Sequence, residues 1–352
     1  MGKNMQNTIK MKSNVGILTM HRVHNCGSFL QAYALQTAIE RLGHKAEVID
    51  YRYPNLYHYE RLGYNPKHYR YSWRAMLHHL RHGRIREAKE MLFHLRFDRY
   101  IERFLHLSQS YPTMESLQHN PPHYDVYCLG SDQTLNPNYI FRDTSFMLGF
   151  APKGARKISY AASMTVPELT EQQAEFYRQY LADFTALSTR ESSGAKVIGS
   201  LLGRDDVETV LDPVFLLSAE EWQKRFGFRQ KRAKYIFYYV LNYMAEVKND
   251  TEKRLNDALA TGRYDGVIRV GGDKHVFPCD FMQLIANAGL VITDSFHASA
   301  FSLIFDTPLQ PVIGKGSKDD RIRDLLARVG DANGRQTEVE HAKQYLQKAI
   351  ID

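Results

Sequence analysis

The apolar residues in the first two thirds of the chain fall into short continuous runs that do not alternate with polar residues. These runs are VGILTM (15–20), AEVIDY (46–51), YDVYCLGSD (124–132), KISYAAS (157–163), FTALSTRES (184–192) and VETVLDPVFLL (207–217). Such runs are typical of strands that are buried on both faces of a parallel sheet. A clear helical pattern, SFLQAYALQTAIERLG (28–43), follows the first run. This part of the sequence therefore predicts a doubly wound α/β domain.

The polar stretch QKRFGFRQKRAK (223–234) interrupts the pattern, which then begins again. The later runs are YIFYYVL (235–241), GVIRVG (266–271), GLVITD (289–294) and LQPVI (309–313), and the helical segments RIRDLLARVG and VEHAKQYLQKAIID follow. We expect a disordered N-terminus over residues 1–14, an N-terminal Rossmann-like domain over 15–225 and a C-terminal Rossmann-like domain over 226–352. Two such domains face a cleft between the carboxyl ends of their strands, where open parallel sheets bind ligands.

Length and composition are those of a globular protein with two domains. The chain has 352 residues, of which 43% are hydrophobic and 24% are charged. No run approaches the roughly 20 apolar residues of a membrane-spanning helix, and the N-terminus lacks the apolar centre of a secretory signal, so we expect a cytoplasmic protein. Cys26, Cys128 and Cys279 are widely separated and odd in number. That argues against a disulfide framework and a zinc site and favours reduced thiols.

The formal net charge of +7 favours anionic partners, and much of the positive excess lies in residues 68–104. Net charge alone does not separate phosphate esters, nucleic acid and acidic glycans as partners. The apolar positions of this stretch follow helical spacing loosely, so we expect a basic helical insertion at about 60–108 with one core face and one basic face. This basic face either is simply solvated or docks against an anionic surface, such as a membrane that carries a lipid-linked substrate.

Several common catalytic motifs are missing from the sequence. No Gly-x-Gly-x-x-Gly follows a predicted strand, and there is no Gly-Lys-Ser/Thr phosphate loop and no Gly-x-Ser-x-Gly elbow. Dinucleotide oxidoreductases, nucleotide-hydrolysing enzymes and Ser-His-Asp hydrolases therefore lose their main local support. The remaining candidates for chemistry are four polar clusters that follow predicted strands.

The first cluster is HRVHNCG, with His21, His24, Asn25 and Gly27 between the first strand and a helix. Gly27 allows a close backbone approach, and the histidines are able to donate hydrogen bonds to sugar hydroxyls. In the alternative interpretation, Asn25 and Gly27 shape the turn while the histidines lie in solvent.

The second cluster is GSDQTLNP (130–137), which contains Ser131, Asp132 and Gln133. Asp132 is a candidate either for capping a helix or for holding a pair of hydroxyls. The third cluster is STRES, in which Arg190 directly follows a predicted strand. Its guanidinium is suited to clamping a phosphate or a carboxylate, and the alternative is a surface salt bridge with Glu191.

The fourth cluster is TDSFHASAF (293–301), where a buried strand ends and a helix begins. Asp294 or Ser295 can cap the helix, whose first backbone N–H groups and positive dipole end attract phosphate. His297, in the first turn, can add a donor to a bound anion or deliver a proton. A histidine that is satisfied within the structure is the alternative.

Seven motifs in the same order resemble the polysaccharide pyruvyl transferase family, over residues 15 to about 330. They are VGILTMHRVHNCGSFLQAYALQ, DVYCLGSDQTLNP, KISYAASM, STRESSG, VLDPVFLL, LIANAGLVITDSFHASAFSLIF and DRIRDLL. The resemblance implies a GT-B-like fold. It also implies transfer of the pyruvyl unit of phosphoenolpyruvate to two hydroxyls of a sugar, which gives a cyclic ketal and inorganic phosphate. We expect no cofactor and no metal.

The resemblance also assigns residues to the donor site. Arg190 and His297 match family positions that contact phosphoenolpyruvate, and both are the expected catalytic residues. Members of the family often have Arg-Leu-His where this chain has Ser295, Phe296 and His297, so one phosphate-neutralising charge is missing. Lys315, Lys318 and above all Arg321, in the basic loop GKGSKDDRI, are candidate replacements. The expected acceptor residues come from the N-terminal half: His24, Asn25, Gly27, Ser131, Asp132 and Gln133.

The expected partners are phosphoenolpyruvate and a sugar or lipid-linked oligosaccharide acceptor, with peripheral contact to the inner face of the membrane and no nucleic acid. Two alternatives stay open. One is a GT-B glycosyltransferase that uses a nucleotide sugar, because it would share the fold. The other is a non-catalytic relative that binds a glycan or a partner protein, because one family charge is absent.

Overall fold

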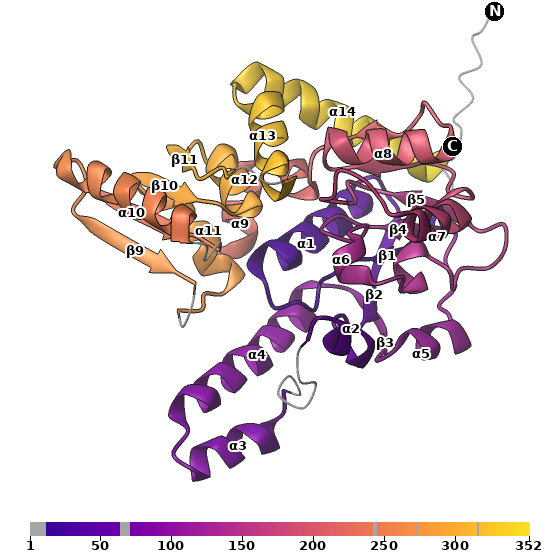
Figure 1. The fold of residues 1–352 in the computed structure, drawn as a ribbon, viewed down its shortest axis with the longest axis horizontal. Helices are drawn as coiled ribbons and strands as arrows, with labels where there is room; N and C mark the ends of the chain where they lie inside the picture. Colours follow the sequence, from indigo (N-terminus) through magenta and orange to yellow (C-terminus); the bar gives the residue numbers. More distant parts are fainter. Residues whose placement is uncertain (1–11, 64–70, 242–244, 272–273, 315–316) are drawn as a thin grey trace, which may run out of the picture.

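The first half of the chain forms a parallel sheet with the strand order β3-β2-β1-β4-β5 (Figure 1). The computed structural model describes residues 12–63, 71–241, 245–271, 274–314 and 317–352. The five strands are β1 (Asn14–Leu18), β2 (Lys45–Tyr51), β3 (Leu107–Tyr111), β4 (Val126–Leu129) and β5 (Arg156–Ser159). Two short parallel strands, β6 (Ser188–Thr189) and β7 (Glu208–Thr209), continue beyond β5, to which a bridge between Ile158 and Ala186 connects them.

Helices cover both faces of this sheet, and one hairpin of helices projects away from it (Figure 1). They are α1 (Cys26–Arg41), α2 (Leu56–Arg61), α3 (Trp73–Arg81), α4 (Ile85–Phe104), α5 (Met114–His119), α6 (Pro137–Ile140), α7 (Glu171–Leu181) and α8 (Ser192–Leu202), with the 3-10 turns η2 (Thr144–Met147) and η3 (Pro213–Leu216). The basic stretch 68–104 thus contains α3 and α4.

The second half forms a parallel sheet of its own with the strand order β11-β10-β8-β9. Its elements are α9 (Ala219–Phe226), β8 (Tyr235–Tyr239), α10 (Ala245–Ala260), β9 (Gly266–Val270), α11 (Pro278–Asn287), β10 (Leu290–Thr293), α12 (Phe296–Ile304), β11 (Leu309–Pro311), α13 (Ser317–Val329) and α14 (Ala332–Ile351). The last helix, α14, returns to the first unit, where Tyr345 donates to the Ser159 carbonyl at 2.8 Å.

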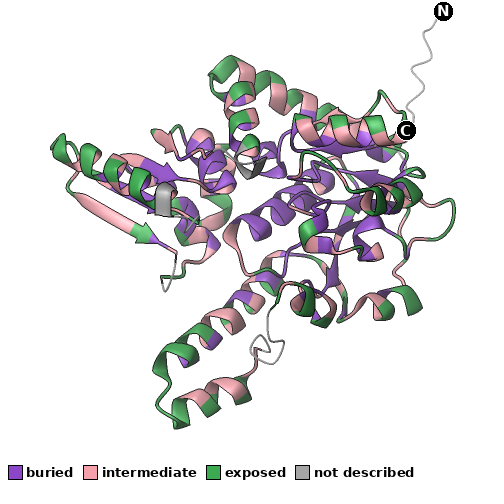
Figure 2. Ribbon diagram, in the orientation of Figure 1, coloured by how far each residue is buried: buried purple, intermediate pink, exposed green. Residues whose placement is uncertain are grey.

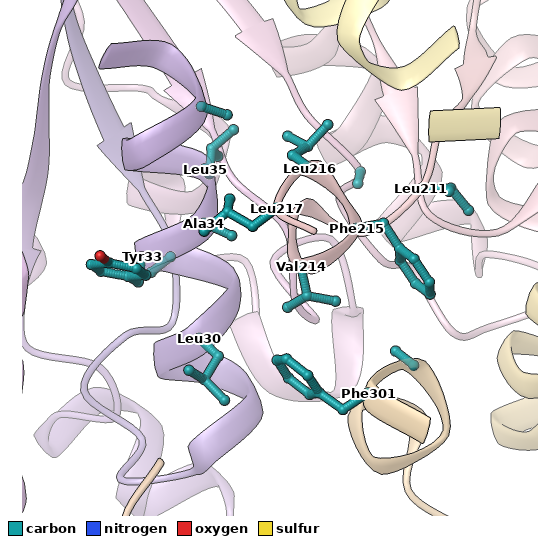
Figure 3. Packing of buried hydrophobic residues seen from close by; sticks show 14 of the residues in the cluster. Leu30, Tyr33, Ala34, Leu35, Leu211, Val214, Phe215, Leu216, Leu217 and Phe301 are labelled. Carbon is teal, nitrogen blue, oxygen red and sulfur yellow. The ribbon is translucent and has the colours of Figure 1, made fainter. Parts of the chain in front are cut away.

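One hydrophobic cluster runs through both units. Figure 3 shows its centre, where Leu30 and Ala34 of α1 face Val214 and Leu217 at η3, and Phe301 of α12 completes the contact. The buried residues form a continuous band through the middle of the molecule (Figure 2). The two units are therefore joined by shared core rather than by a linker alone.

The predicted fold class is confirmed: the chain is α/β, with two Rossmann-like parallel sheets of the GT-B type. The unalternating apolar runs become buried parallel strands, as their pattern indicates. Among the helices of the described ranges, none has the length and apolarity needed to cross a bilayer. Of the predicted disordered N-terminus, residues 1–11 lie outside the described part of the chain, and β1 already begins at Asn14.

Candidate functional site

The four predicted polar clusters follow β1, β4, β6 and β10. Backbone bridges join Asp132 to Ala162 and Ala162 to Thr189, so the segments that follow β4 and β5 run beside the end of β6. The turn η3 contacts both α1 of the first unit and α12 of the second. Residues at the start of η3 can therefore meet side chains from both halves of the chain.

Asp212, which caps η3, is the residue on which these segments converge. Its Oδ1 accepts a hydrogen bond from the backbone N–H of Val214 at 3.1 Å. Its Oδ2 accepts from Arg190 Nη1 at 3.1 Å and from Ser131 Oγ at 2.9 Å, and it lies 3.6 Å from His297 Nε2. We call Ser131, Arg190, Asp212 and His297 the Asp212 cluster. It brings the two expected catalytic residues together on one carboxylate oxygen.

The carboxyl group of Asp212 is fully buried and ionised. Burial alone would raise its pKa, but contact with His297 and the positive charges of His297 and Arg190 hold the pKa well below the usual value. A buried carboxylate is stable only when it is paired and hydrogen-bonded. Asp212 therefore holds Arg190 and His297, which come from different halves of the chain, beside one carboxylate.

Gly27, near the start of α1, lies directly against the His297 ring. A Cβ added at Gly27 would be 2.1 Å from Nδ1 and 2.3 Å from Cγ of His297, so no other residue fits here without movement of the ring. His297 thus has Gly27 on one side and Asp212 on another, both from the first unit. The close backbone approach predicted for Gly27 is present in the structure, and the group that approaches Gly27 is the His297 ring.

The guanidinium of Arg190 is buried and only partly satisfied. Its Cζ lies 4.1 Å from the centre of the Phe296 ring, and its Nε is 3.8 Å from Glu191 Oε1, which is too long for a hydrogen bond. Within the described residues, Arg190 Nε, Arg190 Nη2 and His297 Nε2 have no hydrogen-bond partner. Arg190 is therefore not the surface salt bridge of the alternative interpretation. It is a buried cation with unused donors.

A second guanidinium lies near Arg190. Burial and then the positive charge of Arg190 lower the pKa of Arg321, whereas the charges of Glu191 and Asp132 act in the opposite direction. Arg321 is on α13, so that helix brings a second positive charge within electrostatic range of Arg190. Lys315 lies outside the described residues, and the side chain of Lys318 does as well.

The start of α12 has the expected cap. Ser295 is the N-cap, and its Oγ accepts from the Ala298 N–H at 3.4 Å. The other candidate, Asp294, instead accepts from the Leu241 N–H at 2.7 Å, which ties the end of β10 to the end of β8. The first turn of α12 thus carries Phe296 against Arg190 and His297 against Asp212.

The expected acceptor residues do not gather at one point. Ser131 belongs to the Asp212 cluster and Gly27 lies against its His297, whereas Asn25 is the N-cap of α1 and accepts from the Gly27 N–H at 2.8 Å. Asp132 has a φ of 72° and accepts from the Gln133 N–H at 2.8 Å, and it does not cap a helix, because Asn136 caps α6.

His24 lines a cavity of about 400 Å³. Its Nε2 contacts Asp98 Oδ1 at 3.0 Å, and its Nδ1 is 2.9 Å from Nδ1 of His94. The cavity is lined by charged, amide and tyrosine side chains, among them Arg22, Asn55, Tyr59, Tyr71 and Asp98. We call it the His24 cavity. A few polar groups beside aromatic faces are the usual lining of a small-molecule site.

His21 is structural rather than solvent-exposed. Its Nε2 contacts Asp50 Oδ1 at 3.2 Å, and Asp50 also holds Arg22 through two bonds of 2.7 and 2.9 Å. Burial is the main reason that the pKa of His21 is lowered. The alternative interpretation, in which the histidines of this turn lie in solvent, is therefore wrong for His21 and for His24, because both are held by buried or half-buried carboxylates.

Sequence reasoning missed Asp212 as a site residue, together with the Ser163–Glu191 pair that lies beside Arg190. The signal was present in VETVLDPVFLL, because an Asp-Pro pair directly after an apolar strand is a turn that begins a helix. That signal predicts only that Asp212 caps a helix. The fold is needed to show that Asp212 also lies beside Arg190 and His297.

The sequence matches the family profile described as "Polysaccharide pyruvyl transferase" over residues 25–309. No curated protein matches the chain. Among solved structures, a putative UDP-N-acetylglucosamine 2-epimerase from Listeria monocytogenes is 10% identical, with 95% of this chain and 92% of that one covered at a TM-score of 0.47. UDP-GlcNAc 2-epimerase from Neisseria meningitidis is 10% identical, with 97% and 95% covered at a TM-score of 0.45.

Proposed function

This chain belongs to the polysaccharide pyruvyl transferase family, and on that premise we propose that it transfers the pyruvyl group of phosphoenolpyruvate to a sugar diol. The product is a pyruvate ketal on a precursor of a surface or capsular polysaccharide, and the second product is inorganic phosphate. The observation that carries the proposal is the buried guanidinium of Arg190, whose Nε and Nη2 lack partners in the described part of the chain.

Unused buried donors are costly, and an anion in the same place would satisfy them. Leaving a buried donor unpaired costs about 1–3 kcal/mol, and more when the group is charged. Arg321 adds a positive charge near Arg190, and His297 Nε2 adds a third unused nitrogen. Phosphoenolpyruvate has a phosphate and a carboxylate, so it supplies two acceptors of the required charge. Arginine is well suited to bind either group through parallel hydrogen bonds.

In the proposed reaction, a protonated His297 gives its proton to the methylene carbon of phosphoenolpyruvate. The carbon that bears the phosphate becomes oxocarbenium-like, and the first sugar hydroxyl attacks it and gives its proton back to His297. The C–O bond to phosphate then breaks, with Arg190 and Arg321 stabilising the charge that develops on the departing phosphate. The second hydroxyl closes the ketal, and its proton leaves with the phosphate. Asp212 stays ionised throughout and balances the charge on His297.

The acceptor side of the proposal keeps six residues: His24, Asn25, Gly27, Ser131, Asp132 and Gln133. The best support lies at the His24 cavity, because hydroxyl-binding side chains and tyrosine rings line a space of about 400 Å³ only a few residues along the chain from Gly27. We propose that the acceptor sugar is free or linked to a lipid, and that the enzyme works in the cytoplasm at the inner face of the membrane.

The test is calorimetric titration of phosphoenolpyruvate into the wild type and the His297→Ala variant. His341→Ala is a matched control, since His341 lies on α14 and pairs with Glu208 of β7, which is not a member of the Asp212 cluster. We expect binding to the wild type and to the control, and clearly weaker binding to His297→Ala. Binding of UDP or GDP that phosphoenolpyruvate does not displace would instead favour a nucleotide-sugar glycosyltransferase. Binding of a glycan with no response to either donor would favour the non-catalytic alternative.

A further inference from the structure

The helical hairpin of α3 and α4 projects from the body of the molecule (Figure 1). The two helices contact each other, and α3 contains no buried residue. Its surface is exposed from the turn at Gly83 back along most of its length (Figure 2). A helix of this kind gains little from the core of its own chain, so its outward face is available for a partner.

One exposed side of α3 carries an apolar stripe. Trp73, Leu77 and Leu80 are spaced i, i+4 and i+7, so they lie on one side of the helix, and they are 43%, 48% and 44% exposed. Ile85, at the start of α4, is 50% exposed. Half of the strongly exposed large hydrophobic side chains in the described residues lie in this one hairpin, which is unusual for a surface with no partner.

Basic side chains frame the stripe. Arg74 and Arg81 lie on the same side of α3 as His78, while Arg84 and Arg86 follow at the turn. The Arg99 guanidinium lies 5.2 Å from the centre of the Trp73 ring. Residues 73–104 carry eight arginine or lysine side chains against four aspartate or glutamate side chains. One of the four, Asp98, is already neutralised by Arg22 of the body.

We propose that the α3–α4 hairpin binds the surface of an anionic lipid bilayer, with Trp73, Leu77 and Leu80 in the interfacial layer and the arginines on lipid phosphates. An apolar stripe flanked by basic residues, with a tryptophan at the boundary, is the pattern of helices that lie in a membrane interface. A nucleic acid would fit the charges but would leave the leucines in water. A bilayer accommodates both parts of the surface.

The position of the hairpin connects the anionic bilayer to the proposed function. The link to a lipid-linked acceptor rests on that proposed function. Asp98, on the same helix as Ile85, lines the His24 cavity. The thirteen residue steps from Ile85 to Asp98 span about 20 Å of helix. A saccharide attached to a lipid could therefore reach the His24 cavity while the hairpin tip rests on the bilayer.

The test is flotation with vesicles of phosphatidylcholine alone and with about one third phosphatidylglycerol added. We expect the wild type to bind the anionic vesicles, to bind less as salt rises, and to shift its fluorescence emission to the blue. The chain has two tryptophans, and Trp222 is buried. The emission shift should therefore disappear in Trp73→Phe.

The Leu77→Glu/Leu80→Glu double variant should bind anionic vesicles at least about tenfold more weakly, since two charged side chains would have to enter the interface. Ile351→Glu is the matched control, because Ile351 is 45% exposed on α14. Equal loss in both variants, or no vesicle binding by the wild type, would overturn the proposal. So would binding to duplex DNA or self-association through the hairpin without a blue shift on vesicles.

The vesicle result and the donor result are separable. Leu77 and Leu80 lie outside the Asp212 cluster and outside the His24 cavity, so the double variant should titrate with phosphoenolpyruvate as the wild type does. If the protein bound phosphoenolpyruvate normally but did not bind vesicles, only the proposal that the hairpin binds a membrane would be rejected. If the protein bound vesicles but not phosphoenolpyruvate, only the proposal that phosphoenolpyruvate is the donor would be rejected.

Discussion

Replacing Gly27 by alanine should displace the His297 ring and weaken phosphoenolpyruvate binding. The added Cβ would lie 2.1 Å from Nδ1, 2.3 Å from Cγ and 2.8 Å from Cβ of His297. The optimal separation of two non-bonded carbon atoms is about 3.5–4.0 Å, so the ring and α1 would have to separate by roughly 1.5 Å. Overpacking costs roughly 1–3 kcal/mol, and the better helix propensity of alanine offsets up to about 1 kcal/mol of this. We expect a net loss of about 1–2 kcal/mol in the free energy of unfolding.

The functional loss should be larger than the stability loss. A hydrogen bond to a charged group contributes about 1.5–3 kcal/mol, so losing the His297 contact should raise the Kd of phosphoenolpyruvate by roughly 10- to 100-fold. Calorimetric titration measures the Kd, and urea unfolding measures the stability. Gly194→Ala is the matched control, because Gly194 also lies in the first turn of a helix and its added Cβ would be 3.4 Å from Thr189, an ordinary contact. If Gly27→Ala matched Gly194→Ala in both measurements, His297 would not depend on Gly27 as argued.

Three further changes probe the same structure. Asp212→Asn removes a fully buried carboxylate from its partner Arg190. Because breaking such a pair costs about 3–5 kcal/mol, the urea midpoint of the variant should fall. An unchanged midpoint would contradict the pairing. Burial alone would raise the pKa of Asp50, but His21 and Arg22 hold it well below the usual value. Its stabilising contribution is therefore complete above the unfolded-state pKa of about 3.9 and is lost as the pH falls below it. Asp50→Asn should consequently lose less stability than the wild type between about pH 5 and pH 2, and parallel curves would count against the assignment. Burial raises the pKa of Cys26 and Cys279 and raises that of Cys128 to about 12, so iodoacetamide at neutral pH should label the native protein far more slowly than the urea-unfolded chain, as mass spectrometry can show.

The sequence was sufficient for the sheets because a strand buried on both faces has to be apolar throughout, whatever its neighbours are. It was also sufficient for Arg190, Ser295 and His297 as polar residues at strand ends, since each directly follows an apolar run. That His297 and Arg190 share one oxygen of Asp212 depends on how η3 crosses between α1 and α12. No local pattern encodes that crossing.

The acceptor residues were harder to predict for a related reason. Asn25, Asp132 and Gln133 are polar and follow strands, but their side chains form hydrogen bonds within their own turns. His24 has the same sequence context and instead contacts Asp98, which lies far along the chain on α4. A turn residue and a ligand-binding residue therefore look alike until the long insertion is placed in space.

The serine at position 295 and the arginine at position 321 are best understood together. Ser295 is buried and caps α12, a role worth about 1 kcal/mol, and an arginine at the same position would lose that cap. The positive charge that family members often have at this point therefore has to come from another element if an anion is to be bound. We propose that α13 supplies it, because the charge of Arg190 lowers the pKa of Arg321 on that helix. Two like charges that lie close together repel each other, and a bound phosphate would attract both of them. In the unliganded protein the repulsion between the two guanidiniums lowers the free energy of unfolding, and binding of the anion relieves it. Arg321→Gln should therefore weaken phosphoenolpyruvate binding while leaving the protein at least as stable. Titration and urea unfolding together can test this combination.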